Sequence, residues 1–266
     1  MMKLDNYETL EVSHPSEYVL QVRLNRPFAS NAFNTKMAEE LTECFEFLAT
    51  LPEHTRVVVL TGKGTRAFCA GGDLKERHNM SDEAWFAQHR TYERMVRAVL
   101  GCPLPIIAAV NGAAFGGGCE LVAAVDFAYA ARTAVFAQTE TRLGIMPGAG
   151  GTQCLPRAIG TRRAQELILS GRTFTAEEAH TWGLVNDVTE PNKVLSHALG
   201  MASTIASNAP IAVRQAKLAV SRGMDMSLAN GLGLEIEAYN RLVPTEDRRE
   251  GISSFNERRD PKFEGR

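Results

Sequence analysis

Two glutamates and the glycines around them are the residues of this chain whose types and spacing could do chemistry. Three consecutive glycines at 116–118 run directly into CELVAA (residues 119–124), a good helix-forming segment that contains Glu120, and Glu140 follows in the next segment. Glycines at a helix N-terminus expose backbone N–H groups that attract anionic oxygen. Each such donor contributes about 3 kcal/mol when a carbonyl gains charge during a reaction. Carboxylates beside that oxygen could then move protons.

A second glycine pair, Gly71 and Gly72, lies in AFCAGGDLK (residues 67–75), after an expected strand. Either glycine cluster alone is also typical of an ordinary turn between a strand and a helix. The two clusters, however, follow strands in consecutive strand–helix units. Because neighbouring parallel strands bring their carboxyl ends to one edge of a sheet, we expect the two turns to meet there. Two N–H donors could then converge on one oxygen.

The elements that must position these residues alternate between strand and helix. Apolar and polar residues alternate over 18–24, which predicts a half-buried strand, and apolar residues recur at helical spacing from Thr35 to Leu48 behind Asn34 as a cap. A β-branched run at 57–60 follows. The pattern then repeats with a helix near 85–100, a strand at 105–110, the triple glycine with its helix, and a strand at 126–130. This order predicts an α/β fold with parallel pairing.

Helical signals dominate beyond Gly160, including a capping box at residues 175–178. We expect residues 1–200 to form the α/β core that carries the active site. Residues 201–266 are expected to form a helical region that covers a neighbouring element or another subunit.

Composition narrows the function classes. The chain has 266 residues, 44% of them hydrophobic, and a formal net charge of −2 from 29 basic and 31 acidic residues, so we expect no nucleic acid or anionic membrane partner. Its five cysteines form no CxxC pair, which favours reduced thiols in the cytoplasm and predicts no metal site. Residues 1–10 lack a targeting pattern, and no apolar run approaches the length of a membrane span.

These motifs together identify the chain as similar to the crotonase family, the enoyl-CoA hydratase and isomerase superfamily, nearly from end to end. The motifs that carry the resemblance are NRP (25–27) with Asn31 and Ala32, FCAGGD (68–73), NGAAFGGGCE (111–120), FAQ (136–138), GIMPGAGGTQ (144–153), EDRREG (246–251) and RRDPKF (258–263). The resemblance implies a spiral of β-β-α units and a C-terminal helical region that mediates trimer contacts. It also implies a homotrimer or a dimer of trimers.

The resemblance implies a role for each residue of the central site. The oxyanion hole would consist of the backbone N–H groups of Gly72 and Gly117. In the hydratase branch of the family two glutamates act on a 2-enoyl-CoA, and they fall on Glu120 and Glu140. Glu120 would deprotonate water, Glu140 would deliver a proton to the α-carbon, and the backbone of Gly148 would contact that water. Coenzyme A is then part of the substrate, and no separate cofactor is expected.

Substrate-binding residues are also implied by the resemblance. Those expected to contact coenzyme A are Phe28, Ala29, Ala70, Gly71, Asp73, Leu74, Lys75 and, from a neighbouring subunit, Phe263. Lys75 fits a solvated surface lysine equally well, because a single lysine offers only a point charge. Residues 77–100 are expected to set the acyl specificity, with His78 and His89 either lining the acyl pocket or lying on the surface. Fatty acid β-oxidation, amino acid degradation and aromatic degradation all remain open.

The two glutamates are expected to differ in protonation. Glu120 falls in the first turn of its helix, where the dipole favours the ionised form, and apolar Ile145 and Met146 near Glu140 favour the protonated form. Glu120 would then act as the base and Glu140 as the acid. The alternatives are an isomerase, a decarboxylase or another crotonase-type reaction, and a non-catalytic RNA-binding or scaffold protein. The presence of both glutamates disfavours the first group, and the absence of a lysine-rich stripe disfavours the last.

Overall fold

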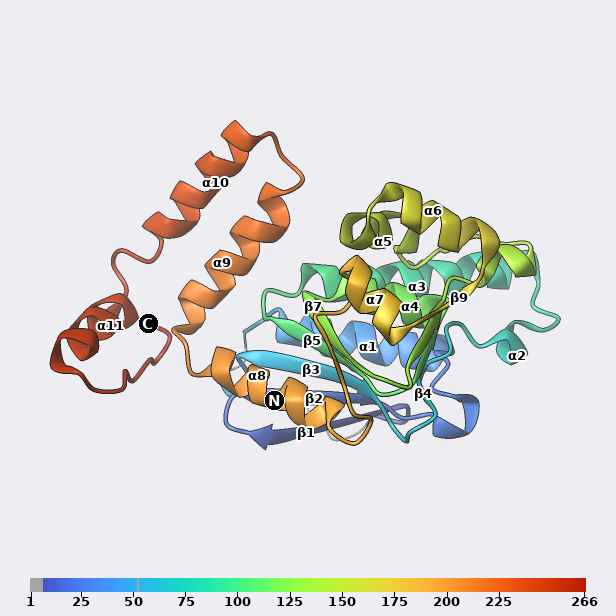
Figure 1. The fold of residues 1–266 in the computed structure, drawn as a ribbon, viewed down its shortest axis with the longest axis horizontal. Coiled ribbons are helices and arrows are strands. Elements are labelled where there is room, and N and C mark those ends of the chain that lie inside the picture. The colour runs from blue at the N-terminus through green and yellow to red at the C-terminus, as the bar shows by residue number, and fades with distance from the viewer. Residues whose placement is uncertain (1–6, 52) are drawn as a thin grey trace.

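The computed structural model describes residues 7–51 and 53–266, which form two sheets surrounded by helices (Figure 1). The larger sheet has the order β1-β2-β3-β5-β7-β10 and the smaller one the order β4-β6-β8-β9. The strands of the larger sheet are β1 Leu10–Ser16, β2 Val19–Leu24, β3 Val57–Gly62, β5 Ile106–Val110, β7 Phe127–Ala131 and β10 Asp187–Thr189. Those of the smaller sheet are β4 Ala67–Cys69, β6 Ala113–Phe115, β8 Val135–Ala137 and β9 Thr173–Thr175.

A repeated unit of two strands and a helix generates both sheets. Each of β3, β5 and β7 lies in the larger sheet, and the next strand along the chain, β4, β6 or β8, lies in the smaller one. Pairing is parallel from β2 through β3, β5 and β7 to β10, and antiparallel only between β1 and β2 in that sheet. The predicted α/β class with parallel pairing is confirmed, as is the repetition of β-β-α units.

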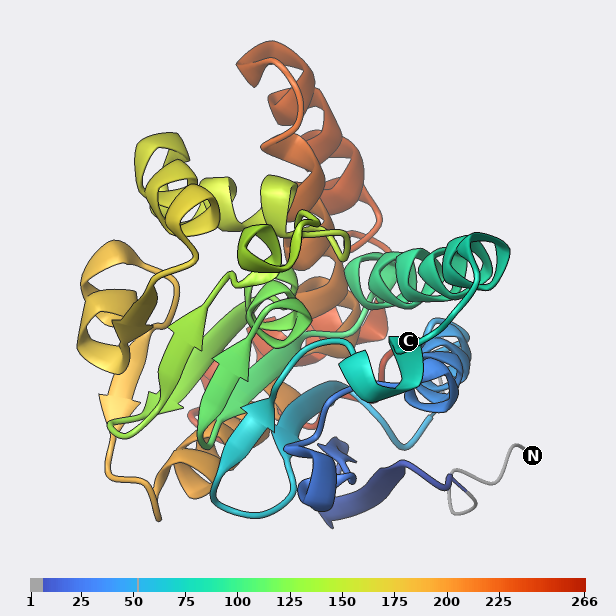
Figure 2. The same ribbon diagram turned by 90° about the vertical axis from the view of Figure 1, so that its right-hand side faces the viewer.

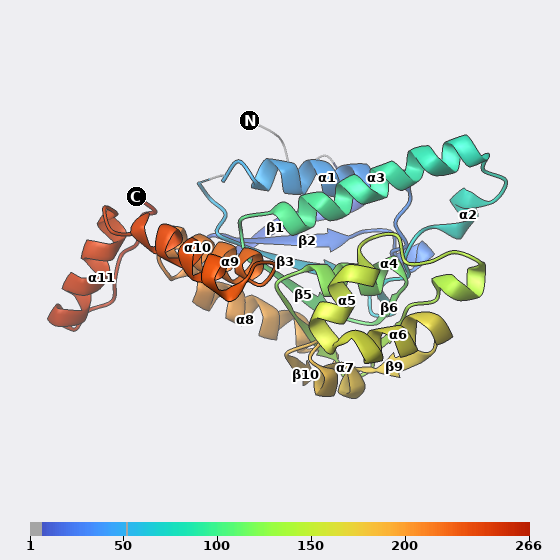
Figure 3. The same cartoon turned by 90° about the horizontal axis from the view of Figure 1, so that it is seen from above.

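Helices cover both faces of the larger sheet (Figure 3). On one side lie α1 Thr35–Leu48, α3 Asp82–Gly101 and α4 Gly117–Ala124, and on the other lies α8 Val194–Ala206. Asn34 caps α1 by accepting a hydrogen bond from the Met37 N–H, as predicted. Because β2 is covered on both faces, Gln21 is buried beside its apolar neighbours, and the prediction of a half-buried strand is wrong.

The remaining elements connect the sheets and extend the chain beyond them. They are the 3₁₀ helices η2 Pro27–Ala29 and η3 Glu140–Leu143, and the helices α2 Leu74–Arg77, α5 Gly151–Ile159, α6 Thr161–Ser170, α7 Ala176–Trp182, α9 Pro210–Gly223, α10 Leu228–Asn240 and α11 Glu246–Glu257. The capping box predicted at residues 175–178 is present at the start of α7.

The C-terminal helices α9 and α10 lie side by side and extend away from the sheets (Figure 1). Leu228, Leu232, Ile236 and Tyr239 of α10 are exposed to solvent in the single chain. The predicted division at residue 200 falls inside α8, which packs against the larger sheet, and it stays a prediction.

Within the described residues, no helix is both long and apolar enough to cross a membrane. The expectation about a targeting segment concerns residues 1–10, and residues 1–6 lie outside the described part of the chain.

Candidate active site

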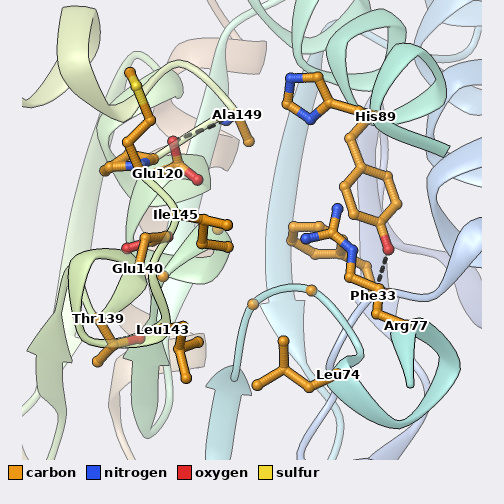
Figure 4. Close-up of a pocket in the computed structure, with 18 of the residues that line it drawn as sticks. Phe33, Leu74, Arg77, His89, Glu120, Thr139, Glu140, Leu143, Ile145 and Ala149 are labelled. Carbon is orange, nitrogen blue, oxygen red and sulfur yellow. Dashed lines mark hydrogen bonds between the residues drawn. The ribbon is translucent and has the colours of Figure 1, made fainter. Parts of the chain in front are cut away.

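A cavity of about 400 Å³ opens where the glycine-rich turns meet (Figure 4). In Figure 2 the parallel strands β4, β6 and β8 of the smaller sheet point toward the region between α3 and α6. The walls come from the segment before α1, the turn after β4, the helices α2 and α3, the start of α4, and residues 139–149. Their residues are Phe33, Ala70, Gly71, Gly72, Leu74, Arg77, Trp85, Phe86, His89, Tyr92, Gly116, Gly117, Glu120, Thr139, Glu140, Leu143, Ile145, Met146, Pro147, Gly148 and Ala149.

Gly72 and Gly117 line this cavity, and neither backbone N–H has an acceptor among the described residues. Phe33 forms a β-bridge with Gly72 through the residues on either side of this glycine. The Phe33 N–H donates to Gly71 O (2.9 Å), and the Asp73 N–H donates to Phe33 O (3.0 Å), so the Gly72 N–H itself is not used. Gly117 is the first residue of α4, so its N–H lies beyond the reach of the helical hydrogen-bond ladder.

The glycines bring the two turns into contact. Gly71 adopts φ +88°, and a Cβ at this residue would lie 3.1 Å from the Gly117 N atom. A Cβ on Gly117 would lie 2.2 Å from Cζ of Phe33, which leaves no room for a side chain. The predicted convergence of the Gly71–Gly72 and Gly116–Gly118 turns is therefore confirmed, and two free donors lie at its centre.

Glu120 is fixed by the second glycine-rich segment. Its Oε1 accepts hydrogen bonds from the N–H groups of Ala149 (2.9 Å) and Gly151 (2.7 Å), and only 2% of the residue is exposed. A Cβ on Gly151 would lie 2.8 Å from the same oxygen, so the carboxylate packs directly against bare backbone. Its orientation in the cavity is thus set before any ligand binds.

Glu140, the first residue of η3, lies beside Glu120 and is held less tightly. It is 8% exposed, and its Oε2 is buried with no partner among the described residues. A Cβ on Gly116 would lie 2.8 Å from Glu140 Oε1, which places this carboxyl against the turn that begins α4. A buried carboxyl oxygen without a partner is costly unless it is protonated or meets a ligand.

Both carboxyl groups hold a proton more tightly than in water. Burial, and then the charge of Glu140, raise the pKa of Glu120 to about 7 against the opposing effect of the two N–H bonds. Burial likewise raises the pKa of Glu140. The expectation that the helix dipole keeps Glu120 ionised is therefore wrong, because burial and the second carboxyl outweigh it, whereas the expectation for Glu140 is confirmed in direction.

The residues predicted to contact coenzyme A are distributed over three places. Ala70, Gly71 and Leu74 line the cavity, next to the N–H pair. Phe28 (84% exposed), Ala29, Asp73 and Lys75 lie outside the lining residues. Phe263 lies in the segment that follows α11, and its carbonyl accepts a hydrogen bond from Arg56 Nη2 (2.8 Å). Figure 1 shows α11 and the C-terminus on the far side of the chain from α2. Their contact with coenzyme A stays a prediction.

Asp73 holds the glycine turn in place. It caps α2 by accepting hydrogen bonds from the Lys75 and Glu76 N–H groups, and its Oδ2 pairs with Arg26 Nη2 at 2.8 Å. Arg26 Nη1 also donates to Ala32 O (2.6 Å), so this pair joins the segment before α1 to the turn that presents the Gly72 N–H.

Substitution of Asp73 is expected to reduce stability. Asp73→Ala removes the cap and the ion pair and should lower the free energy of unfolding by about 1–3 kcal/mol, whereas Asp73→Asn, which can still cap, should lose less. The hydrogen bonds from Arg26 and from the N–H groups of α2 lower the pKa of Asp73 against the effect of burial. The difference in the free energy of unfolding between parent and variant should therefore reach its maximum above pH 3.8, the ordinary pKa of an aspartate. It should shrink as the pH falls through the lower pKa that Asp73 has in the folded protein. Urea unfolding at neutral and acidic pH measures it, and a difference that stays constant with pH would contradict this role.

The wall formed by α2 and α3 faces the two glutamates across the cavity. Arg77, Trp85, Phe86, His89 and Tyr92 line it, so residues 77–100 contribute one side of the cavity, and that they set the acyl specificity stays a prediction. Of the two histidines, His89 lies in this wall and His78 does not. A Cβ on Gly148 would lie 2.5 Å from His89 Cε1, so the segment after η3 closes directly onto α3.

Sequence reasoning missed the donors that fix Glu120. The glycine-rich segment at 147–151 was a visible signal, but only the tertiary fold shows that the N–H groups of Ala149 and Gly151 face the first turn of α4. The packing role predicted for Cys69 and Cys119 is confirmed, because both are fully buried and burial raises the pKa of both thiols.

The site as a whole suits acid–base chemistry next to a carbonyl group. Two free N–H donors can stabilise a developing oxyanion, and two carboxyl groups with raised pKa values lie on the same cavity. The combination of two N–H donors and two carboxyl groups on one cavity of an α/β protein suits chemistry in which a carbonyl oxygen gains negative charge.

Comparison with known proteins identifies the family. The profile of the Enoyl-CoA hydratase/isomerase family matches residues 15–266. The Bacillus subtilis protein YngF, which carries an enoyl-CoA hydratase/isomerase name, is 43% identical over 250 residues, covering 94% of this chain and 96% of its own length. The human mitochondrial methylglutaconyl-CoA hydratase is 36% identical over 265 residues, covering 97% of this chain and 78% of its own. A crystal structure of an enoyl-CoA hydratase from Bacillus anthracis superimposes with a TM-score of 0.95 at 43% identity, over 97% of this chain and 100% of that one.

The chain belongs to the enoyl-CoA hydratase/isomerase family, the crotonase family, whose enzymes act on acyl-CoA thioesters. Its fold is the crotonase fold, as the sequence resemblance implied.

Proposed function

We propose that this protein is an enoyl-CoA hydratase that adds water across the 2,3 double bond of a 2-enoyl-CoA thioester. The observation that carries the proposal is the presence of two buried carboxyl groups, Glu120 and Glu140, on the cavity into which the free N–H groups of Gly72 and Gly117 open. Hydration needs a base for water, an acid for the α-carbon and stabilisation of the thioester oxygen. This cavity offers a residue for each task.

The reaction would proceed with the thioester oxygen bound by the N–H groups of Gly72 and Gly117. Ionised Glu120 takes a proton from water as the water oxygen bonds to the β-carbon, and negative charge develops on the thioester oxygen. Fixed N–H dipoles stabilise that charge without having to reorient. Protonated Glu140 then gives its proton to the α-carbon. The proton gained by Glu120 returns through solvent to Glu140, which restores the starting state.

The geometry supports this division of roles. Two N–H bonds align Glu120 and partly offset the rise in its pKa, so that it can ionise near neutral pH. Glu140 has a buried oxygen without a partner among the described residues, which favours its neutral form. Gly148 lies in the segment that leads into these donors and lines the cavity, in keeping with a backbone contact to the attacking water.

An enoyl-CoA isomerase is the second candidate, because the family name includes both activities. Isomerisation moves one proton between two carbons and needs a single acid–base group, so the second buried carboxyl favours hydration. A non-catalytic RNA-binding or scaffold role has no comparable support, since the formal net charge is −2.

Product analysis separates the two activities. Purified protein is incubated with crotonyl-CoA, and the loss of the conjugated enoyl absorbance is followed with mass measurement of the product. Hydration predicts loss of absorbance together with the gain of one water molecule. Conversion of a 3-enoyl-CoA to a 2-enoyl-CoA without a change in mass, and no reaction of crotonyl-CoA, would overturn the hydratase proposal.

The pH dependence of kcat/KM should show two limbs. Because the pKa of Glu120 is raised to about 7, raising the pH through this range ionises the base and should increase the rate. At higher pH the pair of carboxyl groups loses its remaining proton, so no acid is left for the α-carbon and the rate should fall. The two groups titrate as a coupled pair, so the limbs belong to the pair. An acidic limb near the ordinary carboxyl value of 4.5, or a flat profile, would contradict this assignment.

Partners and setting follow from the same proposal. The substrate would be an acyl-CoA thioester, with coenzyme A as part of the substrate and with no separate cofactor or metal. A homotrimer or dimer of trimers is proposed because the apolar residues of α10 are exposed in the single chain. Light scattering of the purified protein tests this assembly. A cytoplasmic setting and a role in fatty acid metabolism by β-oxidation remain proposals.

A further inference from the structure

Arg77, the last residue of α2, is held in a fixed position at the edge of the cavity. Its Cζ lies 4.1 Å from the ring centroid of Trp85 and 4.9 Å from that of Tyr92, and its Nε donates to Gln88 Oε1 at 2.7 Å. Gln88 in turn donates to Glu76 Oε2 at 2.8 Å. Two aromatic rings and a buried amide therefore orient the guanidinium before a ligand binds.

Arg77 has no direct ion pair with a carboxylate in the part of the chain that the structure describes, and Glu76 reaches it only through Gln88. Its hydrogen bond goes to the neutral amide of Gln88, and no ion pair joins it to an aspartate or glutamate. Glu120 and Glu140 lie on the same cavity, yet Arg77 is not among the groups that shift the pKa of either. Arginine stays protonated at any pH at which the protein is folded. The wall of the cavity therefore contains a permanent positive charge that no direct ion pair balances among the described residues.

The free end of Arg77 points toward the place where the acyl group would lie. Its Cζ and Nη1 are each 3.8 Å from the position that a Cβ on Gly72 would occupy. Figure 4 shows the guanidinium directed into the cavity, across from Glu140 and Ile145. Among the described residues that line the cavity, Arg77 is the only lysine or arginine, and its surroundings are mainly apolar and aromatic. An anion reaching this point would meet one well-defined partner.

We propose that Arg77 binds a carboxylate at the far end of the acyl group, so that this enzyme acts on enoyl-CoA thioesters of short dicarboxylic acids. The inference rests on the proposed function, in which the thioester oxygen lies on the Gly72 N–H, close to Arg77. The planar guanidinium can donate two parallel hydrogen bonds to a carboxylate, which gives both affinity and orientation. A neutral acyl chain leaves this charge unpaired on a partly dehydrated wall, and the enzyme then discriminates against it.

Binding of saturated thioesters tests the inference without depending on catalysis. Glutaryl-CoA carries the terminal carboxylate, and 5-methylhexanoyl-CoA replaces it by a neutral group of similar shape. Isothermal titration calorimetry on the parent, Arg77→Gln, Arg77→Lys and Arg90→Gln measures both ligands. Arg90 is the matched control, since it lies on α3, is exposed and does not line the cavity. The parent should bind glutaryl-CoA at least about tenfold more tightly than the neutral thioester, as charge-assisted hydrogen bonds predict.

The ratio of the affinities for glutaryl-CoA and 5-methylhexanoyl-CoA shows whether Arg77 binds the terminal carboxylate. Arg77→Gln should abolish the preference, Arg77→Lys should keep part of it, and Arg90→Gln should keep all of it. Equal affinities in the parent, or a preference unchanged in Arg77→Gln, would overturn the inference. Equal loss for both thioesters in Arg77→Gln would assign Arg77 to the coenzyme A portion and overturn it as well. Melting curves of the variants exclude loss of folding as the cause.

Turnover separates this inference from the proposed function. Hydration of glutaconyl-CoA and of 5-methylhex-2-enoyl-CoA is compared for the same proteins. Hydration of both at equal kcat/KM would support the hydratase and refute the role of Arg77. Preferential binding of glutaryl-CoA with no hydration of any enoyl-CoA would support the carboxylate site and refute the hydratase.

Discussion

Replacing either buried glutamate by glutamine should reduce kcat for hydration by about 100- to 10,000-fold. In Glu120→Gln the side-chain oxygen can still accept the N–H bonds of Ala149 and Gly151, so the fold of this segment is kept while the base is lost. In Glu140→Gln the proton donor to the α-carbon is lost. Because each carboxyl performs a separate step, both variants should be severely impaired.

The measurement is the rate of loss of the enoyl absorbance at saturating crotonyl-CoA. Glu39→Gln is a matched control, since Glu39 is exposed on α1 and does not line the cavity, and it should keep the parent rate. A Glu140→Gln variant with near-parent kcat would show that a single carboxyl suffices. The proposed division of roles would then fail.

Gly117→Ala is expected to lower kcat by about 100- to 1,000-fold, the loss typical of removing one oxyanion donor. The added Cβ would lie 2.2 Å from Phe33 Cζ, so either the ring or the start of α4 must move. Phe33 is itself paired with the Gly72 turn, and a shift of its ring therefore disturbs both N–H donors. The addition of a single methyl group should therefore produce a large decrease in kcat.

The control is another glycine-to-alanine substitution in a helix. Gly101, the last residue of α3, has open space around its Cβ position, so Gly101→Ala should leave kcat near the parent value. Thermal melting of both variants distinguishes a displaced donor from an unfolded protein. A folded Gly117→Ala variant with kcat within about threefold of the parent would argue against an oxyanion hole at this turn.

The sequence was most informative where a local rule and the tertiary fold agree. Asn34 caps α1, and the capping box of Thr175 and Glu178 begins α7. Both could be predicted because a capping side chain satisfies the backbone donors of its own helix, wherever that helix packs. The convergence of the turns at Gly72 and Gly117 also followed from sequence, since parallel strands leave their following turns on one edge.

Features that depend on distant parts of the chain could not be predicted in the same way. Strands β4, β6 and β8 have three residues each, which is too short for an alternating pattern to appear. The pKa of Glu120 depends on burial and on Glu140, neither of which the first turn of α4 reveals. The positioning of Arg77 by Trp85, Tyr92 and Gln88 likewise exists only once α2 and α3 have packed.

The fate of solvent atoms in a single turnover tests the central claim most directly. Crotonyl-CoA is mixed with excess enzyme in water enriched in both ¹⁸O and deuterium, and the product is examined by mass spectrometry and NMR. Hydration through Glu120 and Glu140 predicts one ¹⁸O at the β-carbon and one deuterium, in a single configuration, at the α-carbon. Deuterium on carbon without any ¹⁸O in the product would show proton transfer without addition of water, and would contradict the account of this protein as a hydratase.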